Sequence, residues 1–312
     1  MSSERTLVTG ASQKHLFLTF DMEEFFGNVF GLGMPAEHMY ELSMPGAERL
    51  VALMEKIEGR ATFFFTLRFA EYCPQIVTKL ASLGHEIACH GYDHDHDYSE
   101  MPFDECRDYL TRSKEGLEDL CGMEVTGYRA PQFYHPDRNL LRELGFVYDS
   151  SLHPWLLDVS KQSKRFLIGG RKALTAQENG VPLPISPRKT RPFIQDGIVV
   201  IPVSVTPLLH LPFSWVWFRN MGYLYAQVCA RMTLWTNEYV HLYFHPYDFS
   251  DLDIAPYNQQ LSRTIVRRTG IPCLSMLEDF SNWCTQEMGL QCIALCDRVE
   301  HWRGESDRGV TH

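Results

Sequence analysis

Two histidines four residues apart, His90 and His94, have a type and a spacing that could do chemistry. Imidazoles at this spacing can point from one helical turn at the same ion, as zinc and related divalent metals require. The surrounding sequence, HGYDHDHD, is polar and acidic, which is also typical of a solvated surface loop, and it holds a further imidazole at His96. The pair by itself leaves both interpretations open, and the surface loop is the commoner of the two.

A group of acidic residues is the second feature. Asp21, Glu23 and Glu24 stand at the end of the apolar segment HLFLTF. Carboxylates held at a strand end can act as oxygen ligands for a metal or as a general base. The first turn of a helix also favours negative charge and explains the same acids without any chemistry. On the pattern alone, neither interpretation is preferred.

One arginine and one more histidine complete the set. Arg129, directly before Ala130 and Pro131, could orient a carboxylate through a two-pronged ion pair, although a lone arginine is more often a solvated surface residue. His245 follows the apolar segment HLYF, so it would lie at a strand end. In isolation, a partly buried structural histidine is the simpler explanation for it.

Alternating strand and helix patterns predict how these residues come together. We expect strands at residues 15–21, 61–66, 85–89, 127–130, 146–149, 197–205 and 241–245, and helices at 45–56, 74–83, 103–120, 138–144, 211–235, 262–268 and 275–286. This alternation predicts parallel βα units. The polar residues would then lie at the carboxyl ends of the strands, where βα barrels hold their chemistry.

Composition limits the classes of function. The 312 residues include 29 Lys or Arg and 39 Asp or Glu, and the net charge of −10 argues against a general binder of nucleic acid or of an anionic membrane surface. Nine scattered cysteines without a CxxC pair predict reduced thiols rather than a disulfide framework. No signal-peptide core and no apolar run long enough to span a membrane is visible, so we expect a cytoplasmic protein.

Taken in order, the four features resemble the polysaccharide deacetylase superfamily (NodB homology, carbohydrate esterase family 4), in the cytoplasmic branch whose first motif is D-x-E-[DE] rather than TFDDG. The resemblance is carried by TFDMEE, GHEIACHGYDHD, GYRAPQF, YDSSLHPW and YFHPYDF, which span Thr19 to Phe249. It implies an α/β fold, a deformed (β/α)7 barrel of the NodB type. We expect a single domain over residues 1–312, with a core at about 15–250 and a C-terminal helical extension at about 251–312.

The resemblance also implies a divalent metal, with zinc expected and cobalt or nickel as alternatives. By motif matching, His90 and His94 would be two of its ligands. Met22 stands where the common motif has its second aspartate, so Glu23 is the expected third ligand, with Glu24 or Asp21 as alternatives.

Three further roles come from the same matching. Asp21 matches the catalytic base, Arg129 the residue that orients this base, and His245 the general acid. Asp149 is a looser match for a residue that holds His245 in its working tautomer.

The implied activity is a metal-dependent hydrolase that uses metal-activated water to remove an N-acetyl group from an amino sugar or glycan precursor, a carbon–nitrogen bond that is not a peptide bond. A cytoplasmic enzyme would act on a nucleotide-linked, lipid-linked or free precursor. Another C–N hydrolase on the same barrel, such as a deformylase or an allantoinase-like amidohydrolase, is one alternative. A non-catalytic carbohydrate-binding homologue is the other.

Two segments bear on partners. The aromatic segment 208–225 could form a wall that stacks on a sugar or touches a polyprenyl tail, or it could be a core helix or a dimer contact. A basic group could pair with a phosphate or simply be solvated: Arg165, Arg171, Lys172, Arg188, Lys189 and Arg191. Peripheral membrane contact and oligomerisation thus stay open, and no nucleic-acid partner or transmembrane segment is expected.

Overall fold

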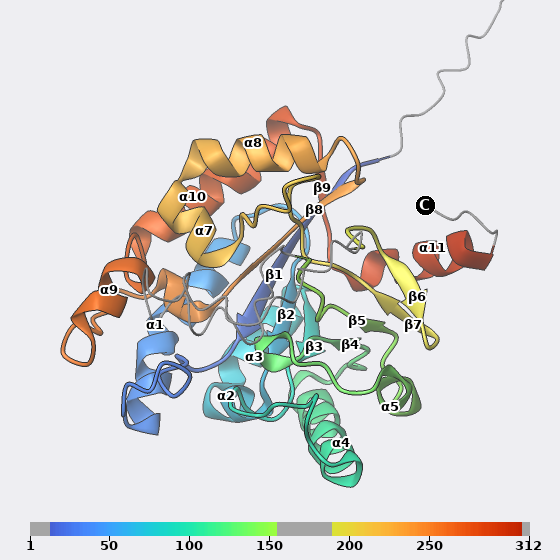
Figure 1. Cartoon of the computed structure of the whole chain (residues 1–312), viewed down its shortest axis with the longest axis horizontal. Helices are drawn as coiled ribbons and strands as arrows, with labels where there is room; N and C mark the ends of the chain where they lie inside the picture. The colour runs from blue at the N-terminus through green and yellow to red at the C-terminus, as the bar shows by residue number, and fades with distance from the viewer. Residues whose placement is uncertain (1–12, 155–188, 308–312) are drawn as a thin grey trace, which may run out of the picture.

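A curled sheet surrounded by helices forms the centre of the computed structural model, which describes residues 13–154 and 189–307 (Figure 1). Its strands are β1 (His15–Met22), β2 (Thr62–Phe65), β3 (Glu86–Cys89), β4 (Gly127–Tyr128), β5 (Tyr148–Asp149), β6 (Phe193–Gln195), β7 (Ile198–Val200), β8 (Tyr239–Phe244) and β9 (Gln291–Cys292). Their order is β6-β7-β5-β4-β3-β2-β1-β8, with β9 beside the start of β1. From β7 to β8 every pairing is parallel, and β6 and β7 form an antiparallel hairpin.

The chain that follows β7 reaches β8 and brings the two ends of the sheet together. The backbone N–H of Ser204 donates to the carbonyl oxygen of His241 at 3.0 Å. In return the backbone N–H of His241 donates to Ser204 Oγ at 2.8 Å. The deformed (β/α) barrel predicted from the sequence is therefore confirmed, with seven parallel strands and short, irregular pairing where the barrel closes.

Helices cover the outside of this sheet (Figure 1). They are α1 (Ala36–Met54), α2 (Leu67–Tyr72), α3 (Pro74–Ser82), α4 (Phe103–Cys121), α5 (Arg138–Glu143), α7 (Trp215–Met221), α8 (Tyr223–Thr233), α9 (Gln259–Ile265), α10 (Ile271–Asn282) and α11 (Cys296–Asp307). Short 3-10 turns follow β4 at Pro131–Phe133 and β8 at Pro246–Phe249, and a π-helical turn follows α10 at Trp283–Glu287.

Two helix predictions were wrong in their bounds. The helix expected from Pro45 begins at Ala36, and Pro45 lies inside it. At the next residue the helix backbone closely approaches the turn after β8. The backbone N–H of Gly46 donates to Ser250 Oγ at 2.9 Å, and a Cβ added to Gly46 would lie 1.7 Å from the carbonyl oxygen of Pro246. The helix expected over 211–235 is two helices, because Gly222 has φ 89° and ψ 178° and ends α7.

The two helices predicted near the C-terminus also differ from the observed helices in their bounds. The one expected at 262–268 is α9 at Gln259–Ile265, and the one expected at 275–286 is α10 followed by the π-helical turn. This part of the chain also contributes β9, which pairs with β1 inside the main sheet. The division into a core and an extension stays a prediction.

Residues of β1 alternate between two apolar clusters. Leu16, Leu18, Phe20 and Met22 pack outward against the helices, whereas Phe17 packs inside the barrel with residues of the opposite strands. Because side chains of a strand alternate between its faces, Thr19 and Asp21 share the inward face with Phe17. This alternation aims Asp21 into the barrel and Met22 away from it.

The remaining sequence features are placed as follows. All nine cysteines are free, as predicted. Among the described residues, no helix is long and apolar enough to cross a membrane. Most of the basic group lies outside the described residues; of its members Lys189 packs on the Phe193 ring and Arg191 Nε donates to the carbonyl oxygen of Thr236 at 2.8 Å.

Candidate metal and acid–base site

Asp21 and Arg129 form a buried ion pair inside the barrel. Arg129 Nη1 donates to Asp21 Oδ1 at 2.6 Å, and the two residues are 0% and 3% exposed. Burial alone would raise the pKa of the Asp21 carboxyl, but the charges of Arg129, His90 and His245 hold this pKa below its ordinary value. Asp21 is therefore a carboxylate at neutral pH.

Arg129 is fixed by neighbours from several strands. Its Nη1 also donates to Thr19 Oγ1 at 2.9 Å, its Nη2 to Ser150 Oγ at 3.0 Å, and its Nε to the Ser150 carbonyl oxygen at 3.2 Å. The guanidinium carbon lies 4.2 Å from the centre of the Phe64 ring. The contact with Asp21 is made through Nη1 alone, so the two-pronged pair envisaged from the sequence does not form. The other donors anchor the guanidinium itself.

Glu23 faces two histidines across a buried space. His90 Nε2 lies 3.0 Å from Glu23 Oε2, and His94 Nε2 lies 3.5 Å from Glu23 Oε1. The other nitrogen of His90, Nδ1, donates to the carbonyl oxygen of Arg129 at 2.8 Å. A carbonyl oxygen only accepts, so Nδ1 carries the proton. Burial also lowers the pKa of His90 to about 4, which keeps Nε2 as a bare lone pair at neutral pH.

As a carboxylate, Glu23 presents an acceptor to the bare Nε2 of His90. Glu23 is 1% exposed, and its Oε2 has no hydrogen-bond partner. Burial and the charges of nearby carboxylates raise the pKa of Glu23 well above its ordinary value. The contact is therefore relieved either by a proton on Glu23 that is donated to His90 Nε2 or by a cation between the two atoms. Adjacent ligand atoms on a tetrahedral zinc ion lie about 3.3 Å apart, and the separations seen here bracket that value. Metal-binding histidines also usually donate their second N–H to a carbonyl, as His90 does.

The donor set thus fits a divalent ion in chemistry and spacing. Within the described residues, no group of three or more His, Cys, Asp or Glu side chains is arranged so that all of them could hold one metal ion as they stand. The fit therefore rests on the facing acceptors and on the orphaned carboxylate oxygen.

Glu24 is directed elsewhere. Its carboxylate accepts a hydrogen bond from the backbone N–H of His94, and burial raises its pKa to about 7. Glu24 thus ties the histidine loop to the end of β1, while Glu23, two residues after Asp21, continues the inward side of the strand.

His245 completes the group from the end of β8. Its Nε2 lies 3.7 Å from Glu23 Oε1. On the other side of the ring, Nδ1 lies 3.3 Å from Asp248 Oδ2, the same oxygen that accepts the backbone N–H of His245 at 2.8 Å. Asp248 Oδ1 in turn lies 2.9 Å from Nε of the fully buried Arg219.

The expectation that Asp149 holds His245 was wrong. Arg138 Nε donates to Asp149 Oδ2 at 2.8 Å, and the backbone N–H of Ser151 donates to its Oδ1 at 2.8 Å. Both oxygens are thus used within the chain around β5. The residue missed was Asp248, and the sequence carried a signal for it, since an acid three residues after a histidine at the start of a helical turn can cap that turn.

Aromatic rings line the space around the histidines. The Trp215 ring lies 5.3 Å from the His245 ring at a steep angle, and Tyr247 stacks on His245 at 4.6 Å. Phe26 stacks on His94 at 5.7 Å. Phe218, by contrast, is fully buried in the core. The segment 208–225 therefore provides both a wall of the site and a core helix, the two roles that the sequence left open.

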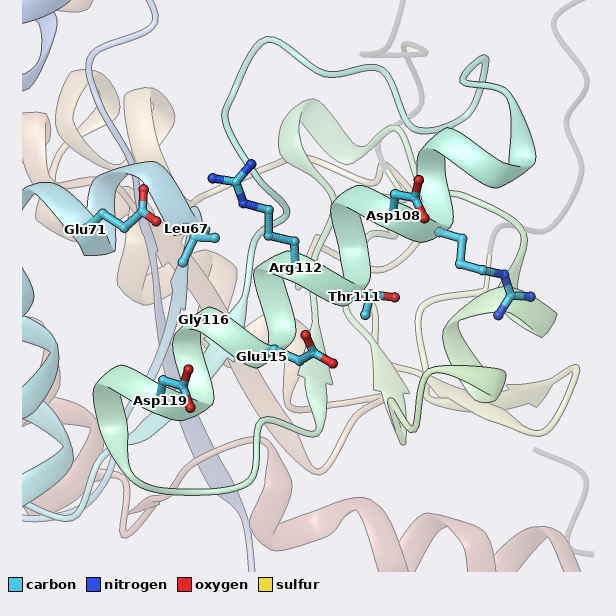
Figure 2. A pocket seen from close by; sticks show the side chains of 9 residues that line it. Leu67, Glu71, Asp108, Thr111, Arg112, Glu115, Gly116 and Asp119 are labelled. Atoms are coloured by element: carbon cyan, nitrogen blue, oxygen red, sulfur yellow. The ribbon is translucent and has the colours of Figure 1, made fainter.

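A separate pocket lies on the outer helices and contains none of these residues. It runs between α2 and α4, and Figure 2 shows its charged side chains pointing out from the helix surface. Its lining consists of Leu67, Glu71, Arg107, Asp108, Thr111, Arg112, Glu115, Gly116 and Asp119.

Both the sequence and the structure of the chain are similar to those of known proteins. Residues 9–148 match the family model described as polysaccharide deacetylase. A peptidoglycan deacetylase from Helicobacter pylori is 35% identical over 109 residues, which are 34% of this chain and 37% of that protein. The match thus spans little more than a third of the length of this curated relative.

Two solved structures resemble nearly the whole chain. One is described as a probable polysaccharide deacetylase from Pseudomonas aeruginosa PAO1, with 16% identity, a TM-score of 0.61, and coverage of 93% of this chain and 90% of that one. The other is the allantoinase Puue, with 15% identity, a TM-score of 0.59, and coverage of 97% and 98%. At these identities both structures show the shared fold.

Proposed function

The chain belongs to the polysaccharide deacetylase (NodB-homology) superfamily, and from this premise we propose that it is a metal-dependent hydrolase that removes an N-acetyl group from an amino sugar or glycan precursor. The observation that carries the proposal is the pair of facing acceptors on Glu23 and His90, beside the carboxylate of Asp21. A buried cation and a neighbouring ionised base are what hydrolysis of an unreactive amide requires.

Glu23, His90 and His94 would hold the divalent ion, with zinc as the first choice and cobalt or nickel as alternatives. When bound, such an ion polarises an acetamide carbonyl and acidifies water. The aspartate that this ion would neighbour, Asp21, accepts the proton of the attacking water. Its ionised state is secured by the ion pair with Arg129.

Expulsion of the amine needs a proton on the sugar nitrogen, and His245 supplies it in this proposal. Asp248 receives the Nδ1–H of His245, so Nε2 faces the site, as its 3.7 Å approach to Glu23 indicates. His245 would donate a proton from one side of the amide, and Asp21 would accept the proton of water on the other side. The two proton transfers thus use different residues.

The aromatic lining supports a sugar ring as the bound group. Trp215 and Phe26 lie against His245 and His94, and Tyr243 lies 5.6 Å from the His245 ring. Aromatic faces provide apolar area at little entropic loss, while the polar groups of the site orient the ligand. We propose a nucleotide-linked, lipid-linked or free N-acetylated amino sugar as substrate.

The test is amine release by the full chain, stripped of metal and reloaded with zinc, cobalt or nickel. N-acetylated sugars in oligomeric, nucleotide-linked and lipid-linked form are compared with N-formyl sugars and with allantoin. We expect release from an N-acetylated sugar only after metal is restored. Release only from formyl sugars or allantoin would assign another C–N hydrolase, and no release from any substrate with metal bound would leave a non-catalytic binding protein.

Two variants distinguish loss of the bound metal from loss of the catalytic base. His90→Ala should lose both bound metal and turnover, because it removes a ligand. Asp21→Asn should keep the metal, measured by elemental analysis after dialysis, and lose turnover about a hundredfold or more. If Asp21→Asn instead released the metal, Asp21 would be a ligand rather than the base.

A further inference from the structure

One segment of the chain exposes an unusual number of large apolar side chains. Eight large apolar side chains of the described residues are at least 50% exposed, and six of them fall between residues 208 and 235. These six, here called the apolar face, are Leu208, Leu209, Met221, Leu224, Val228 and Trp235. Single exposed apolar side chains are common, but a group of this size usually marks a contact surface.

The helix α8 shows that this exposure is systematic. Its inner side buries Ala226, Cys229, Ala230 and Thr233. The opposite side carries Leu224 and Val228, which are four residues apart and therefore adjacent on the surface. A surface helix normally turns polar residues to solvent, so an apolar outward stripe calls for a further partner.

The loop before α7 continues this stripe. Tyr225 Oη donates to the carbonyl oxygen of Pro212 at 2.9 Å, and Thr233 Oγ1 donates to that of Val205 at 3.3 Å. These two bonds hold both ends of the loop along the side of α8. At the tip, Leu208 is 90% exposed. Met221 ends α7 and is separated from α8 by Gly222 alone, and Figure 1 shows α7 and α8 on the same side of the molecule.

Charge around the apolar face differs from that of the whole chain. No Asp or Glu occurs between Asp196 and Glu238, although the chain carries 39 acids. Arg231 is exposed on α8, with its guanidinium carbon 4.7 Å from the centre of the Trp283 ring. Arg268 is exposed near the junction of α7 and α8, where its Nη1 donates to the carbonyl oxygen of Arg219 at 3.1 Å. The net charge of −10 opposes attraction to anionic surfaces in general. Residues 197–237 contribute no carboxylate, and the acids near Tyr223 at the start of α8 are Asp279 and Glu287 of the neighbouring elements.

Apolar side chains with cations and without acids suit an anionic lipid surface. A symmetric dimer fits less well, since the same patch meets itself in an isologous contact. Arg231 of each copy would then approach the other copy with no carboxylate from this segment to pair with it.

We propose that the apolar face docks the protein on an anionic lipid surface, with the leucines, Val228 and Trp235 in the interfacial layer and Arg231 and Arg268 at the headgroups. The first residue of α7, Trp215, contacts His245. Docking through α7 and α8 would therefore set the aromatic wall of the site close to the lipid surface. Docking of the protein on a lipid surface is a property beyond the proposed hydrolysis.

The experiment is co-sedimentation of the full chain with vesicles of phosphatidylcholine, with and without phosphatidylglycerol. We expect binding to the vesicles that contain phosphatidylglycerol, weakening as salt is added. Leu224→Asp combined with Val228→Asp should lower the bound-to-free ratio about tenfold or more, because both charges would enter the apolar layer. Leu208→Asp, at the loop tip, should act in the same direction.

Matched controls come from apolar residues exposed elsewhere. Phe103→Asp and Tyr72→Asp replace side chains that are 50% and 46% exposed outside this segment, and they should leave vesicle binding unchanged. All variants should keep the wild-type circular dichroism spectrum and the wild-type activity on a water-soluble substrate.

Three results would overturn the proposal. One is a wild-type chain that stays in the supernatant with both vesicle types, and another is an equal loss of binding in the control variants. The third is a wild-type dimer, seen without lipid by sedimentation velocity, that Leu224→Asp and Val228→Asp convert to a monomer. That result would assign the apolar face to a second copy of the chain.

Discussion

Replacing Arg129 by methionine tests whether a buried charge pair holds Asp21, the proposed base, in place. Arg129 is fully buried, and its partner Asp21 is 3% exposed, so solvent screens neither charge. Two unit charges about 4 Å apart attract each other by about 4 kcal/mol at an effective dielectric constant of about 20. Removing one partner of a buried pair leaves the other uncompensated, and such changes destabilise proteins by about 3–5 kcal/mol. We expect Arg129→Met to lower the free energy of unfolding by this amount.

A second substitution identifies the cause of that loss. Asp21→Asn in the Arg129→Met background removes the unpaired carboxylate charge. It should restore about 2 kcal/mol of the free energy of unfolding. Asp21→Asn alone should destabilise less than Arg129→Met, because Arg129 keeps acceptors on Thr19 and Ser150. The assay is urea unfolding followed by circular dichroism, in buffer with a chelator so that bound metal does not contribute.

An energetic interaction between residues 21 and 129 is expected, and either of two results would refute it. A loss below about 1 kcal/mol for Arg129→Met would mean that the pair is solvated in solution. A double variant less stable than Arg129→Met would mean that packing and hydrogen bonding, rather than the charge of Asp21, dominate this part of the barrel.

Three further predictions use other parts of the structure. Asp248→Asn should lower kcat about a hundredfold in the amine-release assay with little change in KM, because His245, the proposed general acid, loses its charged acceptor; equal effects on both parameters would indicate loss of substrate binding. Gly46→Ala should cost about 3 kcal/mol or more in urea unfolding, since its Cβ would meet the carbonyl oxygen of Pro246, whereas Gly304→Ala, with no atom within 4 Å of its added Cβ, should not destabilise. Burial raises the pKa of Glu86 above its unfolded value, so its protonated form stabilises the fold at low pH and this contribution is lost as the pH rises through the folded-state pKa. Glu86→Gln should therefore gain stability relative to wild type between pH 4 and pH 8 in denaturation curves, and a constant difference would contradict the assignment.

Much of the site could be inferred from local sequence. Strand β1 is an unbroken apolar segment that ends in acids, and its period of two fixes that residues 21 and 23 share a side while Met22 faces the helices. The four-residue spacing of His90 and His94 is equally local. The alternation of strands and helices predicted parallel strands whose carboxyl ends meet, which is why four motifs far apart in the chain could be expected at one site.

Other features depend on contacts between distant segments, which local periodicity does not encode. The role of Asp149 is one such feature, because its carboxylate is bound by Arg138 and by the backbone of Ser151 rather than by His245. The long reach of α1 past Pro45 depends on the backbone of the turn after β8. Likewise, the pattern of α8 predicts a helix, but only the packed barrel decides which of its sides is left facing solvent. Spacing along the chain determines what each side chain can reach, and the tertiary structure determines which partners are already taken.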